Sequence, residues 1–188
     1  MALVAGHFGY GYAAQYIKGR VSFTFLREPR ERIVSFYNYC RLHKDESAPI
    51  YQLTQNVSLD QFLDLGHRDN LVRDYIYNHQ TWQLASGWGN PSGMTLSEYN
   101  DSAMLGAALS NIRQLSLIGI VDNFYSDFRL LLKMLNLPLF GSRVWRNKSA
   151  FGSSIKSLPS GTRSRLDSLV ELDDALYQKV VEWRKGSR

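Results

Sequence analysis

The chain has 188 residues, of which 44% are hydrophobic and 13% aromatic, and this length suits one well-filled core better than two. The 22 lysines and arginines exceed the 17 acidic residues, and the net charge of +5 favours polyanionic partners such as nucleotides, acidic glycans or nucleic acid. A solvated basic surface explains the same charge equally well. The single cysteine, Cys40, excludes an internal disulfide and a cysteine-based zinc cluster, and its apolar neighbours indicate a buried structural thiol.

No stretch of the sequence approaches the roughly 20 apolar residues that a membrane span needs. The first residues, MALVAGHFGYGY, lack the basic start and the cleavage region of a signal peptide. We therefore expect no membrane span in this chain, and a soluble protein.

Three short apolar runs, each long enough for a buried parallel strand, are expected to form the sheet. They cover residues 2–6, 21–26 and 114–121. Helical patterns lie between and after these runs, and strands that alternate with helices favour a parallel sheet with crossover helices. The sequence thus predicts one α/β domain over residues 1–188.

Four segments are predicted to be helical from their spacing of apolar residues and from their end signals. The first begins at Pro29, a residue suited to the first helical position, and the second begins with a capping box formed by Ser58 and Gln61. The third is amphipathic and cannot continue past Pro138. The fourth, residues 163–185, is expected as one long helix or two short ones.

The segment VSFTFLREPRERIVSFY places a cation where a buried strand ends. If the strand ends at Leu26 and the helix starts near Pro29, Arg27 lies at the edge of the sheet where open α/β folds bind ligands. Ser35 then lies about two turns into the helix, so its hydroxyl and the Arg27 guanidinium are expected to converge on one phosphate. The alternative role for Arg27 is an ion pair with Glu31. Arg30 and Arg32 are assigned to the helix surface and its packing.

The glycine-bearing segment GHFGYG is not a nucleotide-binding loop by itself. It lacks the lysine and hydroxyl residue of a Walker loop, and its glycines do not have the spacing of a dinucleotide-binding fingerprint. Its histidine, His7, directly follows the first predicted strand in a flexible loop, where an imidazole reaches a ligand. A lone histidine is more often structural, so both roles stay open at this point.

Five segments, in order, resemble the family of sulfotransferases that use 3′-phosphoadenosine 5′-phosphosulfate (PAPS). REP with a serine eight residues after the arginine is similar to the family's 3′-phosphate-binding segment, and AGHFGYG to the G-H-[FV] segment of the heparan sulfate 2-O-sulfotransferase-like branch. The remaining three are YNHQTWQLAS, LIGIVDNFYSDFRLLLKMLNLP and VELDDALYQKV. This resemblance covers nearly the whole chain.

The resemblance implies a P-loop-NTPase-like sulfotransferase fold, a parallel sheet with helices on both faces. It implies in-line transfer of the sulfuryl group of PAPS to a hydroxyl of a carbohydrate-like acceptor, without metal. His7 would be the base, Arg27 and Ser35 would bind the 3′-phosphate, and Lys148 would close over the nucleotide unless its role is structural.

In the same comparison, Asn78 and Gln80 would face the acceptor, or else satisfy buried backbone groups. The compartment stays open: the cytoplasm for a bacterial protein, the Golgi lumen for an animal one. The oligomeric state is equally open.

Two features depart from the family. The sequence contains no segment of the type P-K-x-G-[TS], whose backbone and lysine bind the 5′-phosphosulfate, so we expect an N-terminally truncated domain or a lost element. Glu28 stands where the family usually has aspartate. A non-catalytic remnant that binds a 3′-phosphorylated nucleotide or an anionic glycan is therefore the alternative function. A nucleic-acid module is disfavoured, because the basic residues are dispersed.

Overall fold

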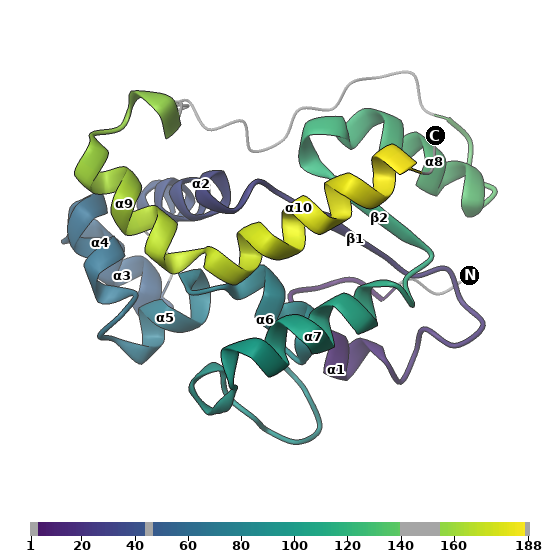
Figure 1. Cartoon of the computed structure of the whole chain (residues 1–188), viewed down its shortest axis with the longest axis horizontal. Coiled ribbons are helices and arrows are strands. Elements are labelled where there is room, and N and C mark those ends of the chain that lie inside the picture. Colours follow the sequence, from purple (N-terminus) through teal and green to yellow (C-terminus); the bar gives the residue numbers. More distant parts are fainter. Residues whose placement is uncertain (1–3, 44–46, 140–154, 187–188) are drawn as a thin grey trace. The chain divides into compact units, whose positions relative to one another are not determined.

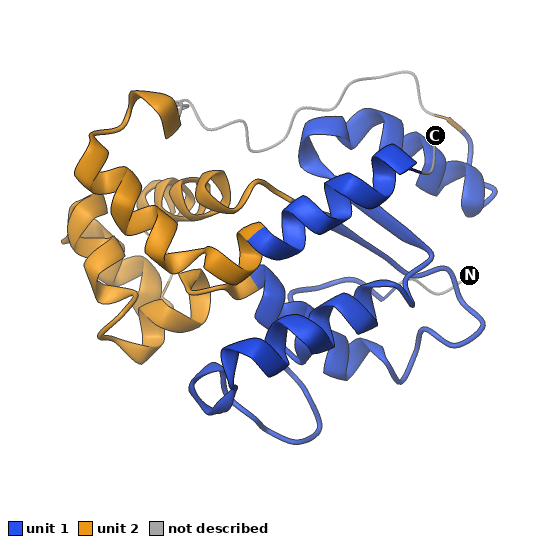
Figure 2. Cartoon of the chain, viewed as in Figure 1, with its two compact units in different colours: residues 1–26, 80–138, 175–188 blue, residues 27–79, 139–174 orange. Residues whose placement is uncertain are grey.

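The computed structural model describes residues 4–43, 47–139 and 155–186. Its contacts divide the chain into two compact units, coloured separately in Figure 2. The first unit comprises residues 1–26, 80–138 and 175–188, and the second comprises residues 27–79 and 139–174. Each unit is therefore assembled from segments that are far apart in the sequence. The described part is mixed α/β, mostly helical, and contains a small parallel sheet (Figure 1).

The sheet belongs to the first unit and consists, within the described ranges, of two strands. Strand β1 (Phe23–Leu26) pairs in parallel with β2 (Leu117–Ile120), so that Phe23 lies opposite Leu117 and Leu26 opposite Ile120. Phe25 lies opposite Gly119, where an added Cβ would stand 2.4 Å from the Phe25 ring. The predicted parallel pairing is confirmed, with strands shorter than the apolar runs that indicated them.

The strand predicted at residues 2–6 is wrong for the part that the structure describes. Val4, Ala5 and Gly6 are not in a strand, and all three are exposed. Residues 2 and 3 lie outside the described residues. The apolar run was read as buried, but a strand needs both a partner for its backbone and a covering for its side chains, and residues 4–6 have no such covering.

The first unit adds a set of helices to the sheet. They are α1 (Tyr10–Ala13), α6 (His79–Ala85, from residue 80), η1 (Leu96–Glu98), α7 (Asp101–Ile112), η2 (Val121–Asn123), α8 (Phe124–Met134) and most of α10 (Glu171–Gly186). The amphipathic helix predicted before Pro138 is confirmed as α8, and its buried residues include Leu131 and Leu132.

An ion pair runs along the outer edge of β2. Leu117 donates its N–H to Ser22, and because alternate residues of a strand point to opposite edges, the peptide groups of Ile118 and Ile120 point away from β1. Arg184 of α10 donates to the Ile118 carbonyl at 2.7 Å, and the Ile120 N–H donates to the Asp127 carboxylate at 2.8 Å. Arg184 and Asp127 also pair with each other at 2.6 Å, so these two side chains make bonds that a third strand would make.

The second unit is helical in its described part. Its elements are α2 (Pro29–Leu42), α3 (Pro49–Gln55), α4 (Leu59–Leu65), α5 (Asn70–Ile76), η3 (Ile155–Ser157), α9 (Ser160–Leu169) and the start of α10. They enclose one apolar core, whose fully buried side chains include Ile33, Phe62, Leu63, Val72 and Leu166. The core is built by α2, α3, α4, α5 and α9, which fixes the direction of the first turns of α2.

Two predictions about helix ends are confirmed in the second unit, and a third point that the sequence left open is decided. Helix α2 begins at Pro29, and Glu28 caps it by accepting the Glu31 N–H at 2.8 Å. Ser58 and Gln61 form the expected capping box at the start of α4. The closing helical segment is two helices, α9 and α10, which are separated at Val170.

Candidate anion site at the start of α2

The turn between β1 and α2 carries Arg27. This residue follows the last residue of β1 and precedes Glu28, the cap of α2, so it lies at the carboxyl end of a parallel strand, as predicted. Arg27 is half-buried. Its backbone position is fixed on one side by the β1–β2 ladder and on the other by the capped start of α2.

Arg32 lies on the first turns of α2 and is close enough to Arg27 for their charges to interact. It donates to the Tyr75 carbonyl at 2.9 Å, which ties α2 to the end of α5. The pKa of Arg32 is lowered to about 10, chiefly by burial; the carboxylate of Asp173 opposes this shift, and the positive charge of Arg27 adds to it. The charges of Arg27 and Asp173 therefore both act on the Arg32 guanidinium.

Ser35 lies on the same side of α2 as Arg32. Residues three positions apart are neighbours on a helix surface, and Ser35 follows Arg32 by three. Ser35 is half-buried, and the next residue, Phe36, stacks on the Tyr75 ring at 5.1 Å and 11°. Ser35 therefore lies one helical turn after Arg32, on the side of α2 that contacts Tyr75.

Arg30 points to a different cluster. Its guanidinium bonds Glu28, Asp167 and Asp174, with distances of 3.0 Å to Glu28 and 3.2 Å to Asp174. Three carboxylates surround this one cation, so Arg30 ties the start of α2 to α9 and α10. This agrees with the surface and packing role that the sequence suggested for it.

Asn78 has a structural task. Its side-chain oxygen accepts the N–H groups of Leu172 and Asp173 at 2.9 and 3.3 Å, and its own N–H donates to Leu169 at 2.8 Å. Its φ of 43° lies in the left-handed region that asparagine adopts more readily than most residues. Asn78 therefore caps the first turn of α10, in agreement with the alternative that it satisfies buried backbone groups.

Three further residues that the sequence singled out are Gln80, Lys148 and Cys40. Gln80 lies in the first turn of α6 and is buried, with an exposed fraction of 8%. Lys148 lies outside the described residues. Cys40 is fully buried, and burial raises the pKa of its thiol to about 12, which confirms the interpretation of a structural thiol.

His7 is exposed and belongs to the first unit, whereas Arg27 and Ser35 belong to the second. The backbone that follows it is held by the loop after α6: Gly9 donates to Trp88 and Gly11 to Ser86, both at 2.8 Å. An added Cβ at position 9 would stand 2.2 Å from the Ser86 oxygen, so this close approach requires glycine. That His7 and Arg27 open onto one cleft stays a prediction.

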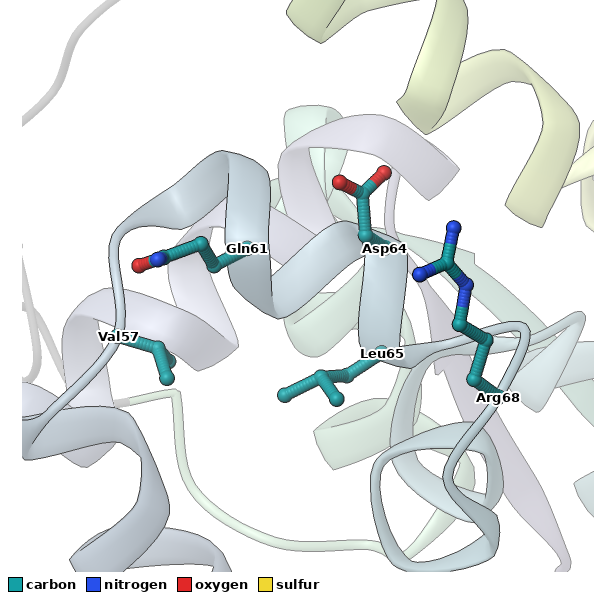
Figure 3. A pocket seen from close by; sticks show the side chains of 5 residues that line it. All are labelled: Val57, Gln61, Asp64, Leu65 and Arg68. Atoms are coloured by element: carbon teal, nitrogen blue, oxygen red, sulfur yellow. The ribbon is translucent and has the colours of Figure 1, made fainter.

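A separate shallow pocket of about 310 Å³ lies on the second unit (Figure 3). It is lined by Val57, Gln61, Asp64, Leu65 and Arg68, none of which the sequence singled out as a site residue. Asp64 pairs with Arg165 at 2.8 Å, and Gln61 accepts the Ser58 N–H at 2.8 Å. Two of its polar groups therefore already serve the packing of α4.

Within residues 4–43, 47–139 and 155–186, no helix is long and apolar enough to cross a membrane. The same residues contain no cluster of three or more histidine, cysteine or acidic side chains suited to a metal ion.

No protein-family model, curated protein or solved structure matches the chain. The resemblance to sulfotransferases therefore rests on the sequence segments, and the function that it implies stays a prediction.

Two residues of the Arg27 cluster were not predicted. Asp173 lies far along the chain, and its distance in sequence gives no signal of its approach to α2. Arg32 was visible in the arginine-rich start of the helix, but it was assigned to packing. Its sequence signals are its spacing of three residues from Ser35, which places both on one helical face, and its position five residues after Arg27, where the family's 3′-phosphate-binding segment has a second arginine.

Proposed function

We propose that this protein is a PAPS-dependent sulfotransferase that transfers the sulfuryl group to a hydroxyl of a carbohydrate-like acceptor. The observation that carries the proposal is the strand-to-helix turn with Arg27 at the end of β1, the capped start of α2, and Ser35 on the face of α2 that bears Arg32. Guanidinium groups and a hydroxyl near one helix start suit a phosphate monoester, because charge-assisted hydrogen bonds are the strong ones. The same segment carries the family resemblance.

In this proposal Arg27 and Ser35 hold the 3′-phosphate of PAPS. They select PAPS over nucleotides that lack this group, and they fix the donor for attack in line with its leaving group. Positioning and neutralisation of charge carry most of the catalysis in the related transfer of phosphoryl groups. His7, by the resemblance, accepts the proton of the attacking hydroxyl, for which a neutral imidazole is suited at neutral pH.

Binding of PAPS or its product without turnover is the second candidate. The observation that favours it is the absence of any proline-lysine dipeptide in the 188 residues, and hence of the P-K-x-G-[TS] segment. The developing charge at the 5′-phosphosulfate is where preorganised donors contribute most to catalysis. A chain that lacks these donors would still bind the 3′-phosphate but would transfer sulfate poorly.

The test measures transfer of labelled sulfate from PAPS to desulfated glycans, together with calorimetric binding of adenosine 3′,5′-bisphosphate. Replacement of Arg27 by alanine removes charge-assisted bonds that contribute about 1.5–3 kcal/mol each, so binding should weaken roughly tenfold or more. Ser35→Ala should weaken it less, because only one neutral hydroxyl is lost. Arg41→Ala, at the far end of α2, is the matched control and should leave binding unchanged.

His7→Ala separates the two candidates. If the chain turns PAPS over, this variant should lose transfer by about a hundredfold or more while binding the bisphosphate as before. Binding without any transfer, in the wild type, supports the second candidate. If wild type and Arg27→Ala bind the bisphosphate with the same affinity, both candidate functions are contradicted.

A further inference from the structure

Three aromatic rings form a row along the segment that follows His7. The ring centroids of Phe8 and Tyr12 lie 5.1 Å apart at an interplanar angle of 50°, and those of Tyr12 and Tyr16 lie 5.2 Å apart at 47°. Phe8 and Tyr12 are half-buried, and Tyr16 is 38% exposed. These three residues, which we call the aromatic row, are therefore a continuous aromatic surface that is partly open to solvent.

The backbone of the aromatic row is held by the loop that follows α6. Gly9 donates its N–H to the Trp88 carbonyl at 2.8 Å. Gly89 has a φ of 76°, and a Cβ added to it would stand 3.5 Å from the Tyr12 Cβ, so Tyr12 packs directly on this loop. Because these contacts already fix the backbone, a ligand of the aromatic row does not have to order it on binding.

The charged residues on the same segment are cations. Lys18 and Arg20 follow Tyr16, both are exposed, and neither forms an ion pair with another described residue. Residues 1–27 contain no aspartate and no glutamate. Glu98, which follows the loop that holds the row, is bonded to Thr95. The segment that carries the aromatic row therefore attracts anions.

A sugar ring is the ligand that these side chains suit best. The C–H groups on its face fit the negative face of an aromatic ring, and its hydroxyl groups need donors and acceptors. The hydroxyls of Tyr12 and Tyr16 and the amide of the exposed Gln15 provide them. Nucleobases also stack on aromatic rings, but single strands bind in a basic groove that follows their phosphates, whereas this segment offers two cations after the row.

We propose that the aromatic row, together with Lys18 and Arg20, binds a carboxylated glycan chain. Its sugar rings stack on the tyrosines, and its carboxylates meet the two cations. This inference rests on the proposed function, since it names a surface for the acceptor. His7 directly precedes Phe8 in the chain, so a glycan on the row is held next to the residue that the resemblance makes the base.

The ring contacts are tested by calorimetry with a hexasaccharide of alternating glucuronic acid and N-acetylglucosamine. Tyr16→Ala should weaken binding roughly two- to tenfold, the range that an aromatic contact contributes, and Tyr16→Phe should stay within about twofold because it keeps the ring. Tyr39→Ala is the matched control, since Tyr39 is 37% exposed and lies on α2. Thermal unfolding of each variant separates loss of binding from loss of folding, and Tyr16→Leu replaces Tyr16→Ala if the latter unfolds.

The charge contacts are tested with the double variant Lys18→Gln, Arg20→Gln. It should weaken binding roughly threefold or more at low salt and reduce the salt dependence, because exposed charges are screened by salt. Lys133→Gln, which removes an exposed charge of α8, is the control and should bind as the wild type does. A neutral hexasaccharide of N-acetylglucosamine should depend on Tyr16 in the same way but lack the salt dependence.

A wild type that does not bind the hexasaccharide, or binds it as tightly as Tyr16→Ala and the double variant do, would overturn the proposal. Tighter binding of a six-residue oligothymidylate would also overturn it and would assign the row to nucleic acid. The nucleotide titration keeps the two proposals distinguishable. Ring-dependent glycan binding without discrimination between adenosine 3′,5′-bisphosphate and adenosine 5′-phosphate would retain this inference and reject the sulfotransferase assignment, and the reverse result would reject this inference alone.

Discussion

At the scale of single residues, the roles predicted correctly from the sequence are those that depend only on residues nearby in the chain. Pro29 begins a helix and Ser58 caps one because proline at the first position and a serine–glutamine box act within four residues. The role of Asn78 could not be fixed in this way. Its partners, Leu169 and Leu172, are more than 90 residues away, so an acceptor-facing amide and a helix cap gave the same local pattern.

Replacement of Asn78 by alanine should destabilise the protein by about 2 kcal/mol or more. The variant loses a capping oxygen, worth about 1 kcal/mol, and leaves N–H groups of the first turn of α10 without it. Equilibrium unfolding in urea measures the change.

Asn136→Ala is a matched control for the backbone, because Asn136 also has a positive φ, 53°, but is exposed. The difference between the two variants isolates the capping bonds. If both lose the same free energy of unfolding, the cap contributes nothing and only the left-handed backbone matters.

At the scale of elements, two of the three predicted strands form, and both are shorter than their apolar runs. The run at 21–26 begins in the sheet at Phe23, and the run at 114–121 ends at Ile120 because Val121 starts a 3₁₀ turn. An apolar run indicates burial, but the ladder itself depends on a partner that the sequence does not specify. The run at 2–6 failed for this reason, because its described residues are exposed.

The edge of β2 depends on contacts between distant residues, which the spacing of apolar residues in the sequence does not indicate. Asp127 and Arg184 bond its outward peptide groups, yet they stand 57 residues apart on two amphipathic helices. From the sequence of a helix alone, such charged residues cannot be told apart from ordinary exposed ones. That they close a strand edge follows only from the packing of α8 and α10 in the first unit.

We expect Asp127→Ala to destabilise the protein by about 3–5 kcal/mol. It leaves the partly buried Arg184 without its carboxylate and the Ile120 N–H without its acceptor. Arg184→Met should cost less, since Asp127 keeps the Ile120 bond.

A double-mutant cycle on the free energy of unfolding measures the coupling, with Lys179→Met as a control for an exposed pair with Glu182. A coupling below about 0.5 kcal/mol would show that the two side chains act independently and that the edge does not depend on the pair.

At the scale of the whole molecule, length and composition limited the possible number of domains but did not reveal how the chain is divided. They indicated one domain, and the structure divides the contacts between two units, each assembled from separated segments. The boundary between the units falls between Leu26 and Arg27. Strand β1 therefore belongs to one unit, and the arginine that would bind the phosphate belongs to the other. The net charge of +5 suited a polyanion of any class, and the phosphate is our proposal for Arg27 and Ser35 at the start of α2.

Calorimetric titration of the wild-type chain with adenosine 3′,5′-bisphosphate and with adenosine 5′-phosphate tests the central claim most directly. The two nucleotides differ by the 3′-phosphate alone, so their difference in affinity measures the grip assigned to Arg27 and Ser35. The bisphosphate should bind at least about tenfold more tightly, because the added group makes charge-assisted bonds of about 1.5–3 kcal/mol. Equal affinity for the two nucleotides would contradict the phosphate site and, with it, the proposed sulfotransferase function.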